Sequence, residues 1–111
     1  MKSNFKPSPP AVKHKYHAVA VETDGIKFSS KKEARVYHSL KLQQSSGEVV
    51  FFLRQVPFYL PGGVKYVCDF QVFYSAGHVR FLDAKGMQTQ TFKAKKRLVE
   101  ALFPPVIIEL I

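Results

Sequence analysis

The sequence is poor in the residues that mark extracellular, membrane and zinc proteins. Its single cysteine, Cys68, has no partner for an intramolecular disulfide, which favours a reducing compartment, and we expect the thiol to be buried as a small hydrophobe. No apolar stretch approaches membrane-spanning length, and the N-terminus has no hydrophobic signal core. The four histidines show no metal-ligand spacing. We therefore expect an intracellular protein without a membrane partner or a zinc site.

Acidic residues are also scarce. Only eight Asp and Glu oppose seventeen Lys and Arg, so the formal net charge is +9 at pH 7. Such an excess favours nucleic acid as a partner, although it also serves solubility. At 111 residues the chain has room for one domain. Because residues 1–15 combine three prolines and four lysines with little apolar material, we expect a flexible basic arm there and a single domain over 16–111.

The sequence after the arm mixes strand and helix signals. Ser30 and Glu33 have the spacing of a capping box, which predicts that a helix follows Ser30, and Gly47 is suited to end it. A second helix is expected over about 90–102, before Pro104 and Pro105. Strands are expected over 16–22, 26–28, 49–55, 58–60, 64–74, 79–85 and 106–110. This order predicts an α/β or α+β fold with a central sheet and a helix on each side.

Two acids interrupt apolar strands. Asp69 lies within the run 64–74, and Asp83 shares a strand face with Lys85 in the next run. A three-residue loop, Ser75-Ala76-Gly77, would place Asp69 opposite Asp83 on one face, whereas a two-residue loop, Ala76-Gly77, would place them on opposite faces. The sequence is compatible with both registers.

Carboxylate oxygens on a shared face suit Mg²⁺ or Mn²⁺, which take further ligands from water and substrate phosphate. In this hypothesis Lys85 orients the attacking water or neutralises charge at the phosphate. The alternative makes Asp69 and Asp83 surface residues at strand ends and Lys85 a solvated lysine before a turn.

Three further residues admit two interpretations each. Glu33 either completes the cap alone or also leans toward the metal site. Gln55 ends an apolar strand and either assists that site or faces solvent. Lys95 falls on the inward face of the second helix, where its stem either snorkels along apolar surface or carries the amine to the scissile phosphate.

Several short blocks together resemble a known pattern. They are Lys15-Tyr16-His17-Ala18, the segment 24–34, Arg54-Gln55-Val56-Pro57-Phe58, Asp69-Phe70, Asp83-Ala84-Lys85-Gly86 and Phe92-Lys93-Ala94-Lys95. From about Lys15 to the end, the chain resembles the PD-(D/E)XK nuclease superfamily and, more closely, a small phage-encoded nuclease-like family of otherwise unassigned function. Two positions depart from the superfamily pattern, since Cys68 stands where its proline would precede Asp69, and Asp83 stands where glutamate is common.

The resemblance implies a restriction-endonuclease-like core with a mixed sheet and Mg²⁺-dependent hydrolysis of phosphodiester bonds. It implies metal ligands at Glu33, Asp69 and Asp83, with Lys85 as the catalytic lysine. We expect a DNA endonuclease, acting in the cytoplasm of a bacterial host on branched or recombination-related DNA of a phage or prophage and working as a homodimer. Backbone contacts are expected from Lys31, Lys32, Lys93, Lys96 and Arg97. The alternatives are a noncatalytic nucleic-acid-binding module that retains the fold, and a phage protein that binds a host protein.

Overall fold

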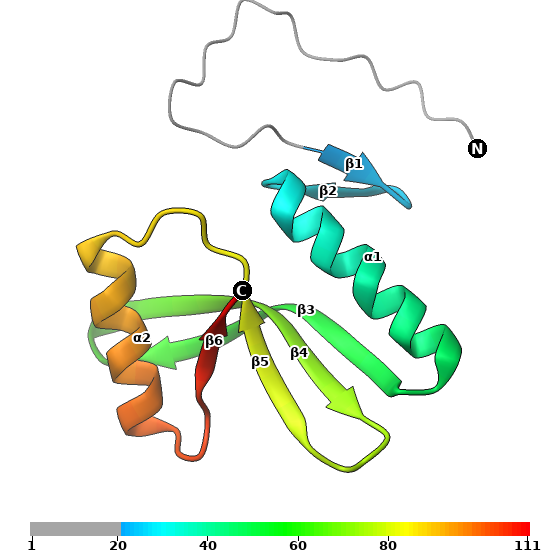
Figure 1. The fold of residues 1–111 in the computed structure, drawn as a ribbon. Helices are drawn as coiled ribbons and strands as arrows, with labels where there is room; N and C mark the ends of the chain where they lie inside the picture. The colour runs from blue at the N-terminus through cyan, green and yellow to red at the C-terminus, as the bar shows by residue number, and fades with distance from the viewer. Residues whose placement is uncertain (1–20) are drawn as a thin grey trace, which may run out of the picture.

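The structure, a computed structural model, describes residues 21–111 and has a mixed α+β fold with two helices (Figure 1). The predicted arm, 1–15, and most of the strand expected over 16–22 lie outside the described residues. The elements are β1 (Val21–Thr23), β2 (Ile26–Phe28), α1 (Lys31–Ser46), β3 (Val49–Leu60), a 3-10 turn η1 (Pro61–Gly63), β4 (Val64–Tyr74), β5 (Val79–Asp83), α2 (Gln90–Leu102) and β6 (Ile108–Leu110).

The main sheet is mixed and has the strand order β3-β4-β5-β6. The first three strands form an antiparallel meander, and β6 returns after α2 to pair in parallel with β5. This parallel pairing needs a crossover connection, which α2 supplies. The short hairpin β1-β2 forms a separate two-stranded sheet beside α1 (Figure 1).

Helix α1 begins and ends where its sequence predicts. The Ser30 hydroxyl accepts a hydrogen bond from the Glu33 backbone N–H, and Gly47 ends the helix with a left-handed φ of 89°. Ala34, Tyr37 and Leu40 recur at helical spacing and are all buried. Neither helix in the described range 21–111 is long and apolar enough to cross a membrane.

The two helices cover opposite faces of the sheet, which confirms the predicted architecture. Leu82 packs in the core that contains Tyr37 and Leu40 of α1, whereas its neighbour Phe81 packs against the core that contains Phe92 and Val99 of α2. Successive residues of a strand point to opposite faces. Figure 1 shows α1 and α2 on either side of the strands.

The predicted division of β3 is wrong, and β5 and β6 are shorter than the strands expected over 79–85 and 106–110. The two strands expected over 49–55 and 58–60 form the single strand β3, in which Pro57 pairs with Val67. Proline is tolerated here because β3 is an edge strand of the sheet, so its missing N–H need not meet a neighbour. The pairing of β3 with β4 shifts register between Val49 and Phe51, and Gln55 has a left-handed φ of 54°.

Candidate active site

The hairpin between β4 and β5 brings Asp69 and Asp83 together. Tyr74 donates its backbone N–H to the His78 carbonyl at 3.0 Å, which closes a three-residue loop whose Gly77 has a φ of 105°. The ladder continues to Phe70 opposite Leu82, so the next position places Asp69 opposite Asp83 on one face. Of the two registers compatible with the sequence, the structure has the one that juxtaposes the acids.

Both acids are removed from solvent, since Asp69 is 7% exposed and Asp83 is 0% exposed. The Tyr66 hydroxyl donates a hydrogen bond to Asp83 Oδ2. Asp83 Oδ1 accepts no hydrogen bond from the described residues and lies 3.3 Å from Lys85 Nζ. This buried carboxylate oxygen is therefore paired with the Lys85 ammonium and can still accept a further donor or cation.

The surroundings of Asp69 alter its ionisation. Burial, followed by a hydrogen bond with Asp83 and the charge of that residue, raises the pKa of Asp69 to about 6, although the Ala84 backbone N–H donates to Asp69 Oδ2 at 2.9 Å. Burial alone would lower the pKa of Lys85, but the charges of Asp69 and Asp83 outweigh that effect and raise it. Lys85 is thus a cation held among carboxylates, and its amine lies 5.7 Å from the centre of the Phe92 ring of α2.

Glu33 is more than a capping residue. Its Oε1 accepts hydrogen bonds from the Ser29 backbone N–H at 3.2 Å and from the Ser29 hydroxyl at 2.9 Å. The predicted capping box is therefore only half formed, because Ser30 caps the helix while the Glu33 carboxylate turns to Ser29. Its Oε2 points toward the sheet, and the whole residue is 2% exposed.

Gln55 links Glu33 to the paired acids. Its side-chain amide donates to Glu33 Oε2 at 3.0 Å and to Asp69 Oδ1 at 3.4 Å. The pairs on either side, Arg54 with Phe70 and Val56 with Cys68, place Gln55 opposite Asp69 in the ladder. A left-handed φ of 54° is rare for a residue other than glycine and costs about 1 kcal/mol or more. Gln55 is itself exposed, so it faces solvent and also contacts the site through Glu33 and Asp69.

A family model described as "Protein of unknown function (DUF1064)" matches residues 13–111. The chain belongs to this family. No curated protein and no solved structure matches it.

Two polar residues of the DUF1064 site were missed in the sequence analysis. The Tyr66 hydroxyl donates a hydrogen bond to Asp83. Tyr66 lies two positions before Cys68 in an apolar run, and both residues are buried. A buried tyrosine hydroxyl needs a hydrogen-bond partner, which is the signal that could have indicated this role. Arg54 lies with its Nη2 3.4 Å from Glu33 Oε2 and with its guanidinium 4.6 Å from the centre of the Phe28 ring. No local signal distinguishes Arg54 from the other basic residues of the chain.

The DUF1064 fold keeps other predicted residues apart from the acids. Lys95 donates its amine to the Lys65 carbonyl at 3.2 Å, at the start of β4, and forms no bond to the acids. Within residues 21–111, no group of three or more His, Cys, Asp and Glu is arranged to hold a metal ion. Glu33 accordingly reaches Asp69 through Gln55 and does not join Asp69 and Asp83 as a third direct ligand.

Cys68 has the structural role expected of it in the DUF1064 core. Its buried thiol faces the carbonyls of Phe70 and Leu82 at 3.5 and 3.4 Å. Burial, followed by the charge of Asp83, raises the pKa of the thiol to about 12. A protonated, enclosed thiol is a poor nucleophile, so the chemistry of this site rests on the carboxylates and Lys85.

Proposed function

We propose that this chain is a metal-dependent DNA endonuclease of the PD-(D/E)XK type, which hydrolyses phosphodiester bonds of branched or recombination-related phage DNA in the cytoplasm of a bacterial host. One observation carries the proposal. Two buried carboxylates lie opposite each other on adjacent strands, and the Lys85 amine lies 3.3 Å from one of them. Burying two acids destabilises the folded state unless a cation compensates their charge. Proteins keep such destabilising groups mainly at functional sites.

The donor set suits a hard divalent cation. Asp83 Oδ1 is buried and accepts no hydrogen bond from the described residues. Burial, followed by the neighbouring Asp83, raises the pKa of Asp69. Mg²⁺ commonly uses one or two carboxylates and completes its shell with water and substrate phosphate, so a third direct acid is not required. Mn²⁺ accepts the same ligands. When bound, such an ion polarises the phosphoryl oxygen and lowers the pKa of a bound water.

The protein's own groups would position the reacting phosphate. Tyr66 and the Ala84 backbone N–H fix the orientations of Asp83 and Asp69. Lys85 remains protonated and can neutralise negative charge that develops on the phosphate. Gln55 is bonded to Glu33 and donates to Asp69 Oδ1, which restrains the Asp69 carboxylate. The same two residues would hold a water molecule beside that oxygen.

The charge of the chain supports a nucleic-acid substrate. The net charge of +9 favours phosphate contacts, which dominate affinity for DNA. The first turn of α1 carries Lys31 and Lys32, and α2 carries Lys93, Lys96 and Arg97. Glu33 at the start of α1 is bonded to Gln55, and Phe92 on α2 lies against Lys85, so both helices approach the candidate site.

A homodimer would allow both strands of a duplex to be cut. The part of the α2-side sheet face that lies beyond α2 exposes apolar side chains that would meet a second copy. On it, the Phe51 ring stacks on Phe73 at 4.3 Å, and Leu53 and Val79 are 46% and 41% exposed. Sedimentation of the purified protein at low and high salt measures directly whether it is a monomer or a dimer.

The noncatalytic alternative has one observation in its favour, namely that three carboxylates do not converge within residues 21–111. Incubation of the protein with linear, flap and four-way DNAs, in Mg²⁺ and in EDTA, separates the two. Mg²⁺-dependent products support the endonuclease. Salt-sensitive binding of the same DNAs without products in either condition supports the binding module.

A further inference from the structure

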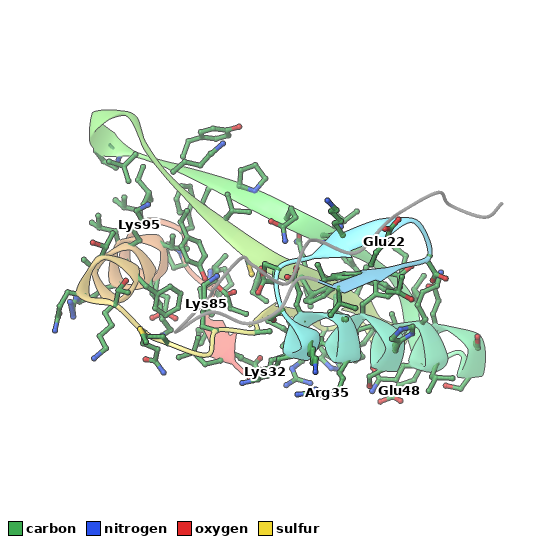
Figure 2. All side chains as sticks on the ribbon, turned by 90° about the horizontal axis from the view of Figure 1, so that it is seen from above. Glu22, Lys32, Arg35, Glu48, Lys85 and Lys95 are labelled. Carbon is green, nitrogen blue, oxygen red and sulfur yellow. The ribbon has the colours of Figure 1, made fainter. Side chains whose placement is uncertain are left out.

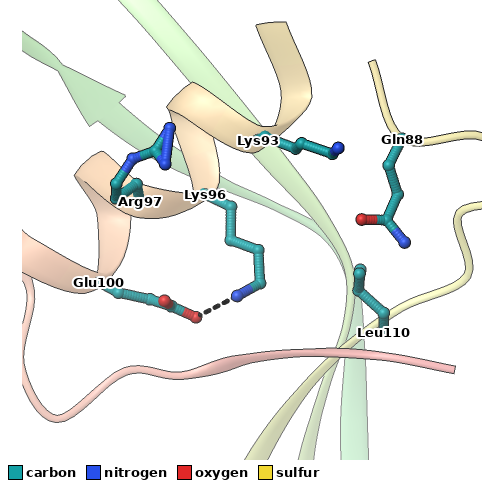
Figure 3. Close-up of a pocket in the computed structure, with 6 residues that line it drawn as sticks. All are labelled: Gln88, Lys93, Lys96, Arg97, Glu100 and Leu110. Carbon is teal, nitrogen blue, oxygen red and sulfur yellow. Dashed lines mark ion pairs between the residues drawn. The ribbon is translucent and has the colours of Figure 1, made fainter. Parts of the chain in front are cut away.

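A basic cavity lies between α2 and the last strand. Its volume is about 260 Å³, and its lining comprises Gln88, Lys93, Lys96, Arg97, Glu100 and Leu110 (Figure 3). Lys93 extends toward Gln88, Gln88 toward Leu110 and Lys96 toward Glu100, while Arg97 lies on the far side of Lys96 (Figure 3). The cavity therefore brings the Lys93 ammonium and the Gln88 amide together, with Arg97 at its edge.

The charge of this cavity is only partly compensated. Lys96 Nζ lies 2.9 Å from Glu100 Oε2, and Glu100 also accepts the Ile108 backbone N–H at 2.8 Å. Within residues 21–111, no acid forms an ion pair with Lys93 or Arg97. The first twenty residues contain no Asp or Glu, so they cannot supply one. Two positive charges thus remain available to an anion.

The cavity adjoins the candidate active site. Leu110 lines it and pairs with Asp83 across the parallel strands β5 and β6, which lie about 4.8 Å apart. Gln88 follows Lys85 by three residues, a span of at most about 11 Å. A nucleic-acid strand whose phosphate lies at Asp69 and Asp83 therefore passes the cavity within one or two nucleotides.

We propose that this cavity binds a phosphate group of a nucleic-acid strand, next to the phosphate at the candidate active site. The placement beside the scissile phosphate rests on the proposed function, whereas the phosphate site itself rests on the cavity. Lys93 and Arg97 supply charge, and the Gln88 amide supplies a neutral donor. Glu100 is the one acid of the lining and opposes the ligand.

Two substitutions that change the charge of the cavity in opposite directions test the site. Fluorescence anisotropy with a labelled single-stranded oligonucleotide in EDTA measures binding without cleavage. Lys93→Gln should weaken binding about tenfold and make the salt dependence shallower by about 0.7 in log–log slope, the change expected for one lost phosphate contact. Glu100→Gln, which keeps an oxygen for the Ile108 N–H, should tighten binding several-fold. A variant that merely unfolds would not bind more tightly.

Two variants control for net charge alone. Lys41→Gln and Glu48→Gln make the same charge changes, on α1 and beyond its far end, and Figure 2 shows Glu48 distant from α2. Equal effects of Lys93→Gln and Lys41→Gln, or no tighter binding by Glu100→Gln than by Glu48→Gln, would overturn the proposal. A tenfold loss in Lys93→Gln on oligonucleotides with and without a terminal phosphate identifies an internal phosphodiester. A loss confined to phosphorylated ends identifies a terminal phosphate.

The outcome is independent of cleavage. Binding in EDTA decides whether the cavity takes a phosphate, even if the wild-type protein cuts no DNA in Mg²⁺. If it does cut, Lys93→Gln should raise KM about tenfold and leave kcat nearly unchanged, because the cavity binds substrate and transition state alike. A fall in kcat with constant KM would contradict a site that only binds.

Discussion

The Lys85 amine lies 3.3 Å from Asp83 Oδ1, and the Asp83 side chain is fully buried. Lys95, by contrast, donates to the Lys65 carbonyl at the start of β4. We therefore expect the two lysines to behave differently. Only Lys85 is placed to stabilise charge at a phosphate held by the acids.

Lys85→Ala should abolish cleavage in Mg²⁺ while DNA binding changes little, because the Lys85 ammonium is already paired with Asp83 in the free protein. Lys95→Met keeps the apolar stem and should cut DNA as the parent does. Nicking rates, anisotropy and melting temperatures of both variants check this. Equal loss of nicking in the two folded variants would show that Lys95 also serves the reaction.

The pKa of Asp69, raised from 3.8 to about 6, predicts a pH-dependent stability. Between these values the folded protein binds a proton that the unfolded chain has released, so the free energy of unfolding should fall as the pH rises through this window. The fall attributable to Asp69 is on the order of 3 kcal/mol. Urea unfolding in EDTA should show it in the wild type, and Asp69→Asn should lack it. A difference between the two proteins that is constant across the window would refute the raised pKa.

Glu33 contributes to two arrangements that substitutions can separate. Glu33→Gln can still accept from Ser29, but its amide would then face the Gln55 amide, donor against donor. We expect nicking to fall about tenfold or more while the fold survives. Ser30→Ala removes only the helix cap and should cost about 1 kcal/mol of stability without a loss of nicking. Normal nicking by Glu33→Gln would reduce Glu33 to a structural residue.

Gln55 combines a strained backbone with a bridging amide. Gln55→Ala and Gln55→Gly both remove the amide, but only glycine relieves the left-handed φ of 54°. The glycine variant should be about 1 kcal/mol more stable than the alanine variant, and both should lose nicking activity to a similar extent. Urea unfolding and nicking assays report the two effects separately. Full activity in the stabler glycine variant would show that the bridge to Glu33 and Asp69 is dispensable.

Local signals predicted much of the fold. The Ser30 cap and Gly47 set the ends of α1, and residues 64–74 and 90–102 form the strand and helix expected of them. The expectation that β3 would break near Pro57 was wrong because its edge position, a tertiary property, removes the penalty for proline.

The candidate site was predictable only in part. Ser75-Ala76-Gly77 is compatible with two loop lengths, so the opposition of Asp69 and Asp83 became definite only with the ladder of β4 and β5. Tyr66 could not be assigned to Asp83, since 17 positions separate them along the chain. The role of Gln55 could not be predicted either, because its contacts to Glu33 and Asp69 depend on how α1 packs against β3 and β4.

The most direct test of the account is nicking of supercoiled plasmid by the wild type and by Asp83→Asn, in Mg²⁺ and in EDTA. The asparagine retains an oxygen for the Tyr66 hydroxyl, so the variant should fold and bind DNA. The account predicts nicking by the wild type that EDTA abolishes, and a loss of more than about 100-fold in Asp83→Asn. Equal nicking by the two proteins, or none by the wild type on plasmid and branched DNA alike, would contradict it.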